Sequence, residues 1–272
     1  MTETRSPETE LQAQRREAVA ERLRNRPLWQ RLHHHLRNQL SPAVFAFVAL
    51  VSGAVWVFVE VAEEVAAGET HAFDEAVLLW MRNATDRALP AGPAWLETVM
   101  RDITALGGVT VLGMLVASVV GILWFQSRHR TAIFLLVAVA GGQLFSNIAK
   151  AIFDRPRPDL VPHGTLVTSA SFPSGHSMMS AVIWLTLAAM VARTEPSRPL
   201  RIYLMSMAIL ITVLVGISRV YLGVHWPTDV IGGWAAGLAW AMGCTALAKI
   251  IDPLPEPPAP EMRSAGEPPP RG

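Results

Sequence analysis

The chain has 272 residues, of which 51% are hydrophobic and only 17% are charged, and its formal net charge is +1. This apolar excess is typical of a membrane protein and excludes a chain that is mainly disordered. The single cysteine, Cys244, excludes a disulfide framework and cysteine-rich zinc or iron–sulfur sites, and the near-neutral charge gives no indication of nucleic-acid binding.

The first 41 residues are polar and rich in arginine, and they contain no apolar run of the kind found in a cleaved signal peptide. Two interpretations of residues 8–40 remain open: a basic amphipathic helix on anionic lipid, or a solvated tail. We expect residues 1–41 to form a cytoplasmic basic N-terminal segment. Residues 252–272, which are rich in proline, are expected to form a disordered C-terminal tail.

Six apolar runs follow the N-terminal segment, and each can cross a bilayer as a helix, alone or with weakly polar flanks. They cover residues 42–61, 105–125, 131–149, 177–192, 202–218 and 230–248. Apolar residues at helical spacing over 71–82 and 94–101 predict two short interfacial helices on either side of a Pro-Ala-Gly-Pro turn. The expected fold is therefore all-α: a six-transmembrane-helix bundle over residues 42–251, with short interfacial helices between the first two spans.

Basic residues are distributed unevenly over the segments that connect these runs. The two termini and the connections 126–130 and 193–201 hold 16 of the 23 lysines and arginines. Because cytoplasmic segments carry the excess of basic residues, we expect both termini in the cytoplasm and six helices across the cytoplasmic (inner) membrane. The other three connections then face outward, into the periplasm.

Polar residues capable of chemistry gather in three clusters, 150–158, 173–176 and 218–229, all within or next to the outward connections. Polar residues at the ends of membrane helices are candidates for function. The clusters contain three cations without matching carboxylates, which indicates an anionic ligand such as phosphate. These cations are Lys150, Arg157 and Arg219.

Two histidines add acid–base and nucleophilic chemistry to this predicted anion site. His176 directly follows Ser174 and Gly175, and this step opens a helix whose free N–H groups favour an anion. Asp229 follows His225 by four residues, so its carboxylate can accept a hydrogen bond from the imidazole and fix its tautomer. Positioned cations and histidines are sufficient for phosphoryl transfer, so we expect no metal and no other cofactor.

The three clusters resemble the signature of the type 2 phosphatidic acid phosphatase (PAP2) superfamily: Lys-x6-Arg-Pro, Pro-Ser-Gly-His and Ser-Arg-x5-His-x3-Asp. Every specified position is filled here, in the same order. The resemblance implies that His225 is the nucleophile, that Asp229 orients it, and that His176 protonates the leaving oxygen and then activates water. It also implies a phosphate-binding set: Lys150, Arg157, Ser174, Gly175 and Arg219.

Arg155 lies in the first cluster, but the spacing of the signature selects Arg157 instead. We therefore expect Arg155 to be a surface residue or a contact to a lipid headgroup.

The resemblance implies a membrane lipid phosphatase that acts on a lipid phosphate or diphosphate through a phosphohistidine intermediate, without metal. Undecaprenyl diphosphate, phosphatidylglycerophosphate and phosphatidic acid are the implied substrates, and membrane lipids the implied partners. One alternative is a catalytically silent lipid-phosphate binding or transport protein of the same fold, which the presence of both histidines argues against. Another is a vanadate-dependent haloperoxidase, a soluble enzyme with the same anion pocket, which the six apolar runs argue against.

Overall fold

The computed structural model describes residues 42–161 and 169–251, and within these ranges the chain is helical with no strand. The all-α prediction is therefore confirmed for this part of the chain. The predicted N-terminal segment and C-terminal tail lie outside the described residues. The chain divides into two compact units, residues 1–50 and 51–272, and the helix Pro42–Ala67 crosses the boundary between them.

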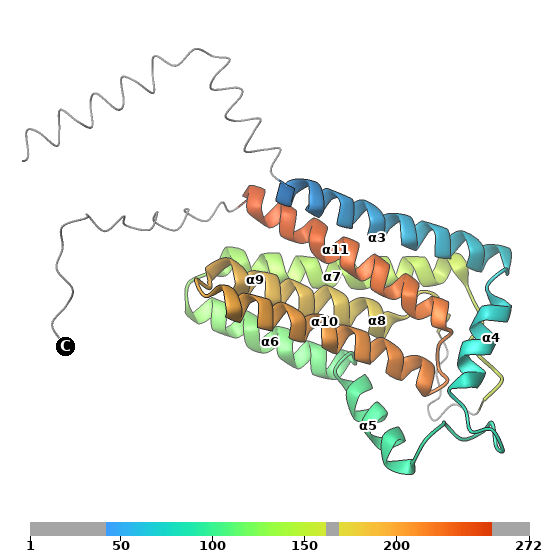
Figure 1. Cartoon of the computed structure of the whole chain (residues 1–272). Helices are drawn as coiled ribbons and strands as arrows, with labels where there is room; N and C mark the ends of the chain where they lie inside the picture. The colour runs from blue at the N-terminus through green and yellow to red at the C-terminus, as the bar shows by residue number, and fades with distance from the viewer. Residues whose placement is uncertain (1–41, 162–168, 252–272) are drawn as a thin grey trace, which may run out of the picture. The chain divides into compact units, whose positions relative to one another are not determined.

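The long helices run alongside one another, and two short helices lie at one end of them (Figure 1). Three segments form one helical span: α8, a wide π-helical turn η1, and α9. The long elements are α3 (Pro42–Ala67), α6 (Val109–Phe125), α7 (His129–Phe153), α8 (Gly175–Ser180), η1 (Ala181–Leu185), α9 (Thr186–Thr194), α10 (Arg198–Tyr221) and α11 (Pro227–Ile251). The short helices are α4 (His71–Trp80) and α5 (Ala94–Ala105).

Five of the six predicted apolar runs lie within one helical span each, and the second run is divided between α5 and α6. Among the described residues, five helices are long and apolar enough to cross a membrane, and α5 with α6 forms a sixth candidate that is bent by 42°. The helix α5 ends at Ala105, and Gly108, three residues later, precedes α6 with an extended backbone (φ −77°, ψ 149°), so the bend lies between the two helices. As a result α6 begins at Val109 and has 17 residues, fewer than the roughly 20 that span a bilayer.

The main core lies where α6 and α7 meet the span formed by α8 and η1. Its buried residues come from these helices and from α11: Leu112, Val116, Leu135, Met178, Met179, Val182, Ile183 and Ala236. Since the surroundings of a membrane helix are apolar too, the fit between these side chains, more than their apolar character, holds the helices together.

The short helix α4 is amphipathic and packs against the turn between α10 and α11. Leu78 is fully buried and packs with Val220, Trp226 and Val230. The opposite face of α4 exposes Phe73 and Trp80. Both predicted short helices, α4 and α5, are present. The packing of α4 fixes the end of the bundle at which α11 begins. The position of the two short helices at a membrane interface remains a prediction.

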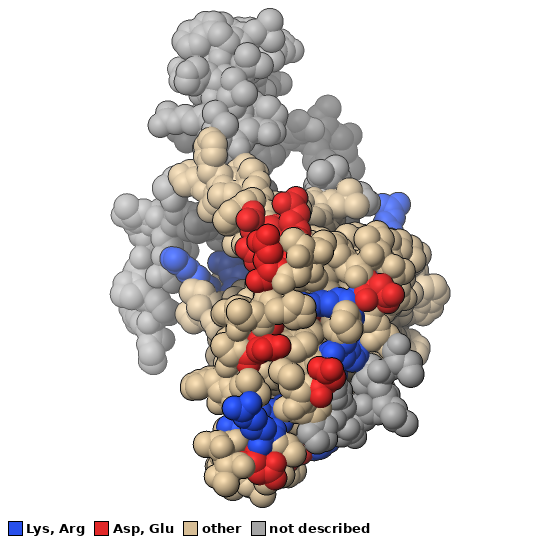
Figure 2. Space-filling view, turned by 90° about the vertical axis from the view of Figure 1, so that its right-hand side faces the viewer, with Lys and Arg blue, Asp and Glu red and all other residues tan. Residues whose placement is uncertain are grey.

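This end of the bundle also carries many of the charged side chains. Figure 2 views the molecule from this side and shows acidic and basic residues gathered among uncharged ones. The flanks of the long helices, in contrast, expose large apolar side chains, such as Trp56, Val137 and Ile209.

Candidate active site

The three polar clusters of the sequence come together at the end of the bundle that carries α4. Lys150 lies in the last turn of α7 and Arg219 in the last turn of α10. The helix α7 ends because Asp154 adopts a left-handed conformation (φ 37°) and Pro156 and Pro158 follow it. The chain therefore leaves α7 within the site and returns to it at the start of α8.

His225 and Asp229 form the pair that the sequence predicts. The Nδ1 of His225 lies 3.2 Å from Oδ2 of Asp229, which also accepts a hydrogen bond from the backbone N–H of Trp226. On the other side of the ring, Nη1 of Arg157 lies 3.1 Å from Nε2 of His225. A guanidinium only donates hydrogen bonds, so Nε2 of His225 is the acceptor of this one. The ring proton is therefore on Nδ1, which donates a hydrogen bond to Oδ2 of Asp229.

The surroundings of His225 keep its ring neutral. The side chain is 2% exposed. Burial lowers the pKa of His225 well below its ordinary value, and the nearby cations Arg157, Arg219 and Lys150 lower it further. A neutral imidazole with its proton on Nδ1 carries an electron pair at Nε2, which is the form needed for nucleophilic attack once the hydrogen bond from Arg157 to Nε2 is released.

The three predicted cations surround the Nε2 side of His225. Lys150 donates to the carbonyl of Ala170 (2.7 Å). Arg157 donates to the carbonyls of Ser169 (2.9 Å) and Val224 (2.7 Å). The third cation, Arg219, is 8% exposed and donates through Nη1 to the hydroxyl of Thr104 (3.0 Å). Its buried Nε has no hydrogen-bond partner among the described residues, so an anion could satisfy it.

The start of α8 differs in one respect from the prediction. The side chain of Ser174 caps the helix by accepting a bond from the backbone N–H of Ser177. However, the backbone N–H of Ser174 donates to the carbonyl of Asp229 at 2.9 Å, so it is not available to a phosphate. Gly175 and His176 begin the helix and line the same cavity as the three cations.

Arg155 was expected at the surface, and that expectation is wrong. Its side chain is 7% exposed and forms ion pairs with two carboxylates, Asp229 (2.7 Å) and Asp74 of α4 (2.6 Å). It also donates to the hydroxyls of Thr228 and Thr70, both at 2.8 Å. Arg155 therefore holds the oxygen of Asp229 that does not face His225.

Asp74 is a site residue that the sequence reasoning missed. It is fully buried, and its carboxylate accepts bonds from the backbone N–H (2.9 Å) and the hydroxyl (2.7 Å) of Thr228. One signal was available in the sequence: Asp74 precedes the apolar Leu78 and Met81 by four and seven residues, so it lies on the inward face of the helix. A carboxylate on that face requires a cation, but only the fold shows that the cation is Arg155.

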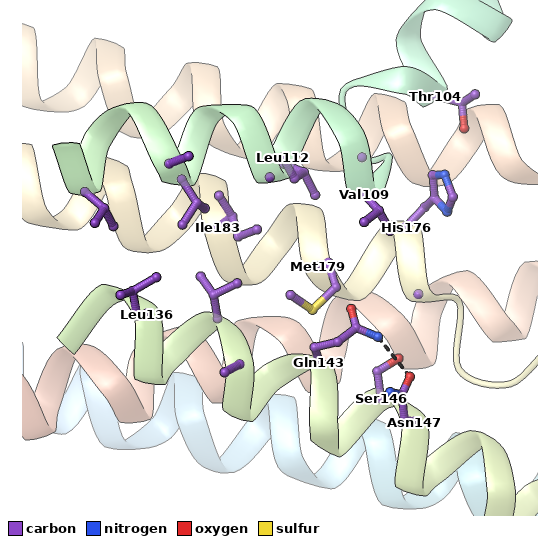
Figure 3. A pocket seen from close by; sticks show the side chains of 18 of the residues that line it. Thr104, Val109, Leu112, Leu136, Gln143, Ser146, Asn147, His176, Met179 and Ile183 are labelled. Carbon is purple, nitrogen blue, oxygen red and sulfur yellow. Dashed lines mark hydrogen bonds between the residues drawn. The ribbon is translucent and has the colours of Figure 1, made fainter. Parts of the chain in front are cut away.

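A large groove begins at this site and runs between α6 and α7 (Figure 3). Its volume is about 1230 Å³, and His176, His225 and the three cations line one end of it. Trp124 and Phe125, at the far end of α6, line the other. Lining residues such as Val109 and Leu136 are strongly exposed, so the groove is open to the surroundings of the bundle along its length.

The residues at the site fit an anion better than a metal ion. Within residues 42–161 and 169–251, no three His, Cys, Asp or Glu side chains are grouped as metal ligands. Asp229, the carboxylate beside His225, is already bound to Arg155 and the imidazole. That the reaction needs no metal remains a prediction.

Comparison with known proteins agrees with the signature. The family model described as the PAP2 superfamily matches residues 131–250. Over 149 residues the chain is 38% identical to phosphatidylglycerophosphatase B of Bacillus subtilis, covering 53% of this chain and 71% of the relative. The chain belongs to the PAP2 superfamily. The matched residues of this PAP2 chain contain all three clusters.

Two further relatives agree in fold and in family. An undecaprenyl-diphosphatase of Sulfolobus acidocaldarius is 32% identical over 121 residues, which are 43% of this chain and 54% of that relative. The crystal structure of a transmembrane PAP2-type phosphatidylglycerolphosphate phosphatase from Bacillus subtilis superposes with a TM-score of 0.66 at 28% identity. It covers 75% of this chain and 98% of that one. The bundle is thus a PAP2 membrane-phosphatase fold, and the relatives named here are lipid phosphatases.

Proposed function

We propose that this protein is a membrane lipid phosphatase that hydrolyses a lipid phosphate or diphosphate through a phosphohistidine intermediate. The observation that carries the proposal is the arrangement around His225. Its Nδ1 is bonded to Asp229, its Nε2 faces Arg157, and the ring lies at the end of an apolar groove. A nucleophile, a cation cluster and a place for a lipid chain are therefore adjacent.

In the first step, Nε2 of His225 attacks phosphorus, and the bond from phosphorus to the oxygen of the lipid breaks. The leaving oxygen takes a proton from His176, which lines the same cavity. As the imidazole becomes positively charged, the carboxylate of Asp229 stabilises it. Lys150, Arg157, Arg219 and the N–H of Gly175 would hold the phosphate oxygens, while Ser174 acts as the cap of the helix.

In the second step, water attacks the phosphohistidine. His176 takes a proton from the water as its oxygen forms a bond to phosphorus, and the bond from phosphorus to Nε2 breaks. Inorganic phosphate leaves, and His225 returns to its neutral form with the proton on Nδ1. In this scheme the fixed cations stabilise the charge in each transition state, so no metal is required.

The groove between α6 and α7 supports a lipid as the substrate. A lipid in the bilayer could present its phosphate to the site while its chain remains between the two helices. We propose six spans, with α5 and α6 counted as one, both termini in the cytoplasm and the site on the periplasmic face. Undecaprenyl diphosphate, phosphatidylglycerophosphate and phosphatidic acid are the candidate substrates.

The proposal predicts that the purified full-length protein releases phosphate from at least one of these lipids with EDTA present. We expect the His225→Ala variant to lose this activity by at least a thousandfold, because no nucleophile remains. The assay measures phosphate release in detergent, with a soluble phosphate ester as a comparison substrate. Vanadate should compete with the lipid, because it resembles five-coordinate phosphorus.

Each outcome of this assay has a distinct meaning. Substantial activity in His225→Ala would contradict the role of His225. A requirement for a divalent cation would contradict the metal-free site. Lipid binding without release of phosphate by the unmodified protein would favour the alternative, a catalytically silent lipid-phosphate binding protein.

A further inference from the structure

Two amides lie in the groove, on the membrane-spanning helix α7. Gln143 and Asn147 are one turn apart, and Nε2 of Gln143 donates to Oδ1 of Asn147 at 2.9 Å. Both side chains are exposed at the surface of the bundle, and both line the groove (Figure 3). Their mutual bond uses one N–H group and one carbonyl, so N–H groups of both amides remain for a ligand.

A third polar side chain lies on the same stretch of α7, next to Asn147. Ser146 is fully buried and lines the same groove, and its hydroxyl has no hydrogen-bond partner among the described residues. A Cβ placed on Gly175 would lie 3.9 Å from this hydroxyl, so Ser146 is next to the start of α8. A buried hydroxyl without a partner indicates a missing ligand or water.

These three residues differ from the rest of the groove. Deeper in the groove, beyond Gln143, its walls are apolar, with Leu112, Leu136 and Ile183 among the lining residues. Amides exposed to hydrocarbon are unfavourable unless they find polar partners. The polar residues are also confined to one stretch of α7: Asn147 is three residues, or about 4.5 Å of helix rise, from Lys150, and Gln143 is about 10.5 Å from it.

This stretch corresponds to a part of the substrate in which the candidate lipids differ. In a diacylglycerol phosphate, two ester groups lie between the phosphate and the chains, and their carbonyl oxygens accept hydrogen bonds. In a polyprenyl monophosphate, the hydrocarbon chain begins at the phosphate oxygen, so no acceptor lies there, whereas a polyprenyl diphosphate has its second phosphate in this position. Donors placed just beyond a phosphate site therefore find acceptors in the ester-linked lipid and none in the polyprenyl monophosphate.

We propose that Gln143, Asn147 and Ser146 form a binding site for the glycerol–ester region of the substrate, and that this site selects diacylglycerol phosphates over polyprenyl monophosphates. This inference rests on the proposed function, since it takes the cation cluster as the phosphate site. A site that bonds polar groups of its substrate discriminates against an analogue that lacks them, because its own polar groups then lose their partners.

The test compares three lipids on two proteins: phosphatidic acid with ester-linked chains, the same lipid with ether-linked chains, and undecaprenyl phosphate. The variant Gln143→Leu/Asn147→Leu replaces the amides with side chains suited to a membrane helix. We expect kcat/KM for the ester lipid to fall about tenfold, the size that two ordinary hydrogen bonds give. For undecaprenyl phosphate, kcat/KM should change less than twofold, and the variant should no longer distinguish the ester lipid from the ether lipid.

Two control variants separate the proposal from a general effect on α7. Gln143→Asn/Asn147→Gln keeps both amides and should retain most of the preference for the ester lipid. Leu144→Ala/Ile148→Ala changes two exposed residues of the same helix that do not line the groove, and it should leave all three activities unchanged. An equal loss on all three lipids in the Leu variant, or no loss on any, would overturn the proposal.

Binding measurements keep this test separate from the test of the proposed function. Affinities of the ester and ether lipids are measured in nanodiscs with His225→Ala, with and without the two Leu substitutions. A tenfold preference for the ester lipid that disappears with the Leu substitutions would support the site even without turnover. Equal affinities of the ester and ether lipids would overturn the proposal. A dimer of the unmodified protein that the Leu substitutions dissociate would also overturn it, because the amides would then belong to an interface between two copies.

Discussion

Arg155 determines how the carboxylate beside the candidate nucleophile is held. Its guanidinium binds Asp229 with one nitrogen and Asp74 with the other, and it lies 5.7 Å from the ring centre of Trp226. The orientation of His225 therefore depends on contacts that extend to α4, through a cation that the family signature does not specify. An arginine fork can hold two carboxylates at once, which a lysine cannot do with the same geometry.

We expect Arg155→Ala to destabilise the protein by about 3–5 kcal/mol, because it leaves two buried carboxylates without their cation. The matched control is Arg101→Ala, which breaks an exposed pair with Glu97 and should change stability by less than about 1 kcal/mol. Both are measured by thermal unfolding in detergent. Arg155→Lys should retain part of the stability. It should reduce kcat by a larger factor than it changes KM, because Asp229 would lose its fixed orientation.

If Arg155→Ala proved no more destabilising than Arg101→Ala, the ion pairs of Arg155 would not contribute as described. A variant with full stability and unchanged kcat would separate Arg155 from the site altogether.

The sequence predicted the residues of the signature but not those that support them. The spacing of four residues between His225 and Asp229 is enough to predict their contact, because Asp229 lies in the first turn of α11 and His225 lies two residues before that helix begins. The partners of Arg155 are 74 and 81 residues away along the chain, and no local pattern relates them. The amide of Ser174 is a similar case, since its acceptor is the carbonyl of Asp229 on another helix.

At the scale of elements, α8 and α11 lie close together because two glycines of α11 face α8. A Cβ on Gly233 would lie 2.8 Å from the carbonyl oxygen of Ser174, and one on Gly237 would lie 2.6 Å from that of Met178. Small residues four apart allow membrane helices to approach in this way. The contact fixes the start of α8, with His176, relative to the start of α11, with Asp229.

We expect Gly237→Ala to lower stability by about 1–3 kcal/mol, because the added methyl group meets backbone atoms that cannot move alone. Gly243→Ala on the same helix is the control: its added methyl has nothing within 4 Å, and it should be neutral or slightly stabilising. Thermal unfolding and phosphate release are measured for both variants. Equal effects of the two substitutions would show that the approach of α8 and α11 does not depend on Gly237.

The apolar runs located the helices well, because their length and composition are set by the membrane and not by distant contacts. The boundary of α6 was the exception. The apolar residues continue through Gly107 and Gly108, so hydropathy alone does not show the bend of 42° between α5 and α6. The chain at this bend packs closely against α8 and α10: a Cβ on Gly107 would lie 3.2 Å from the carbonyl oxygen of His176 and closer still to Cγ1 of Val215.

At the scale of the whole molecule, the two histidines and the three cations of the candidate site lie at one end of the bundle. The connections 126–130 and 193–201 lie at the opposite end of the helices, and they carry the basic residues expected on the cytoplasmic side. The proposed topology therefore places the site in the periplasm.

Cysteine labelling tests this topology. In a Cys244→Ser background, we expect Thr85→Cys to react with a membrane-impermeant maleimide in intact spheroplasts, because Thr85 is exposed at the end of the bundle that carries the site. Gln126→Cys, in the connection between α6 and α7, should react only after permeabilisation. The reverse pattern would place the site in the cytoplasm and contradict the proposed orientation.

The carbonyls that accept bonds from Lys150 and Arg157 have a consequence for turnover. A phosphate that enters would accept the hydrogen bonds that Lys150 and Arg157 now donate to the carbonyls of Ala170, Ser169 and Val224. The affinity for phosphate is therefore the difference in free energy between the bonds to phosphate and the bonds to these carbonyls. When inorganic phosphate leaves, the carbonyls can recover those bonds, and no cation has to face hydrocarbon alone. In the proposed reaction, such an exchange of partners would let a strongly cationic site release a small anion readily, while the groove would hold the chain of a lipid substrate for longer.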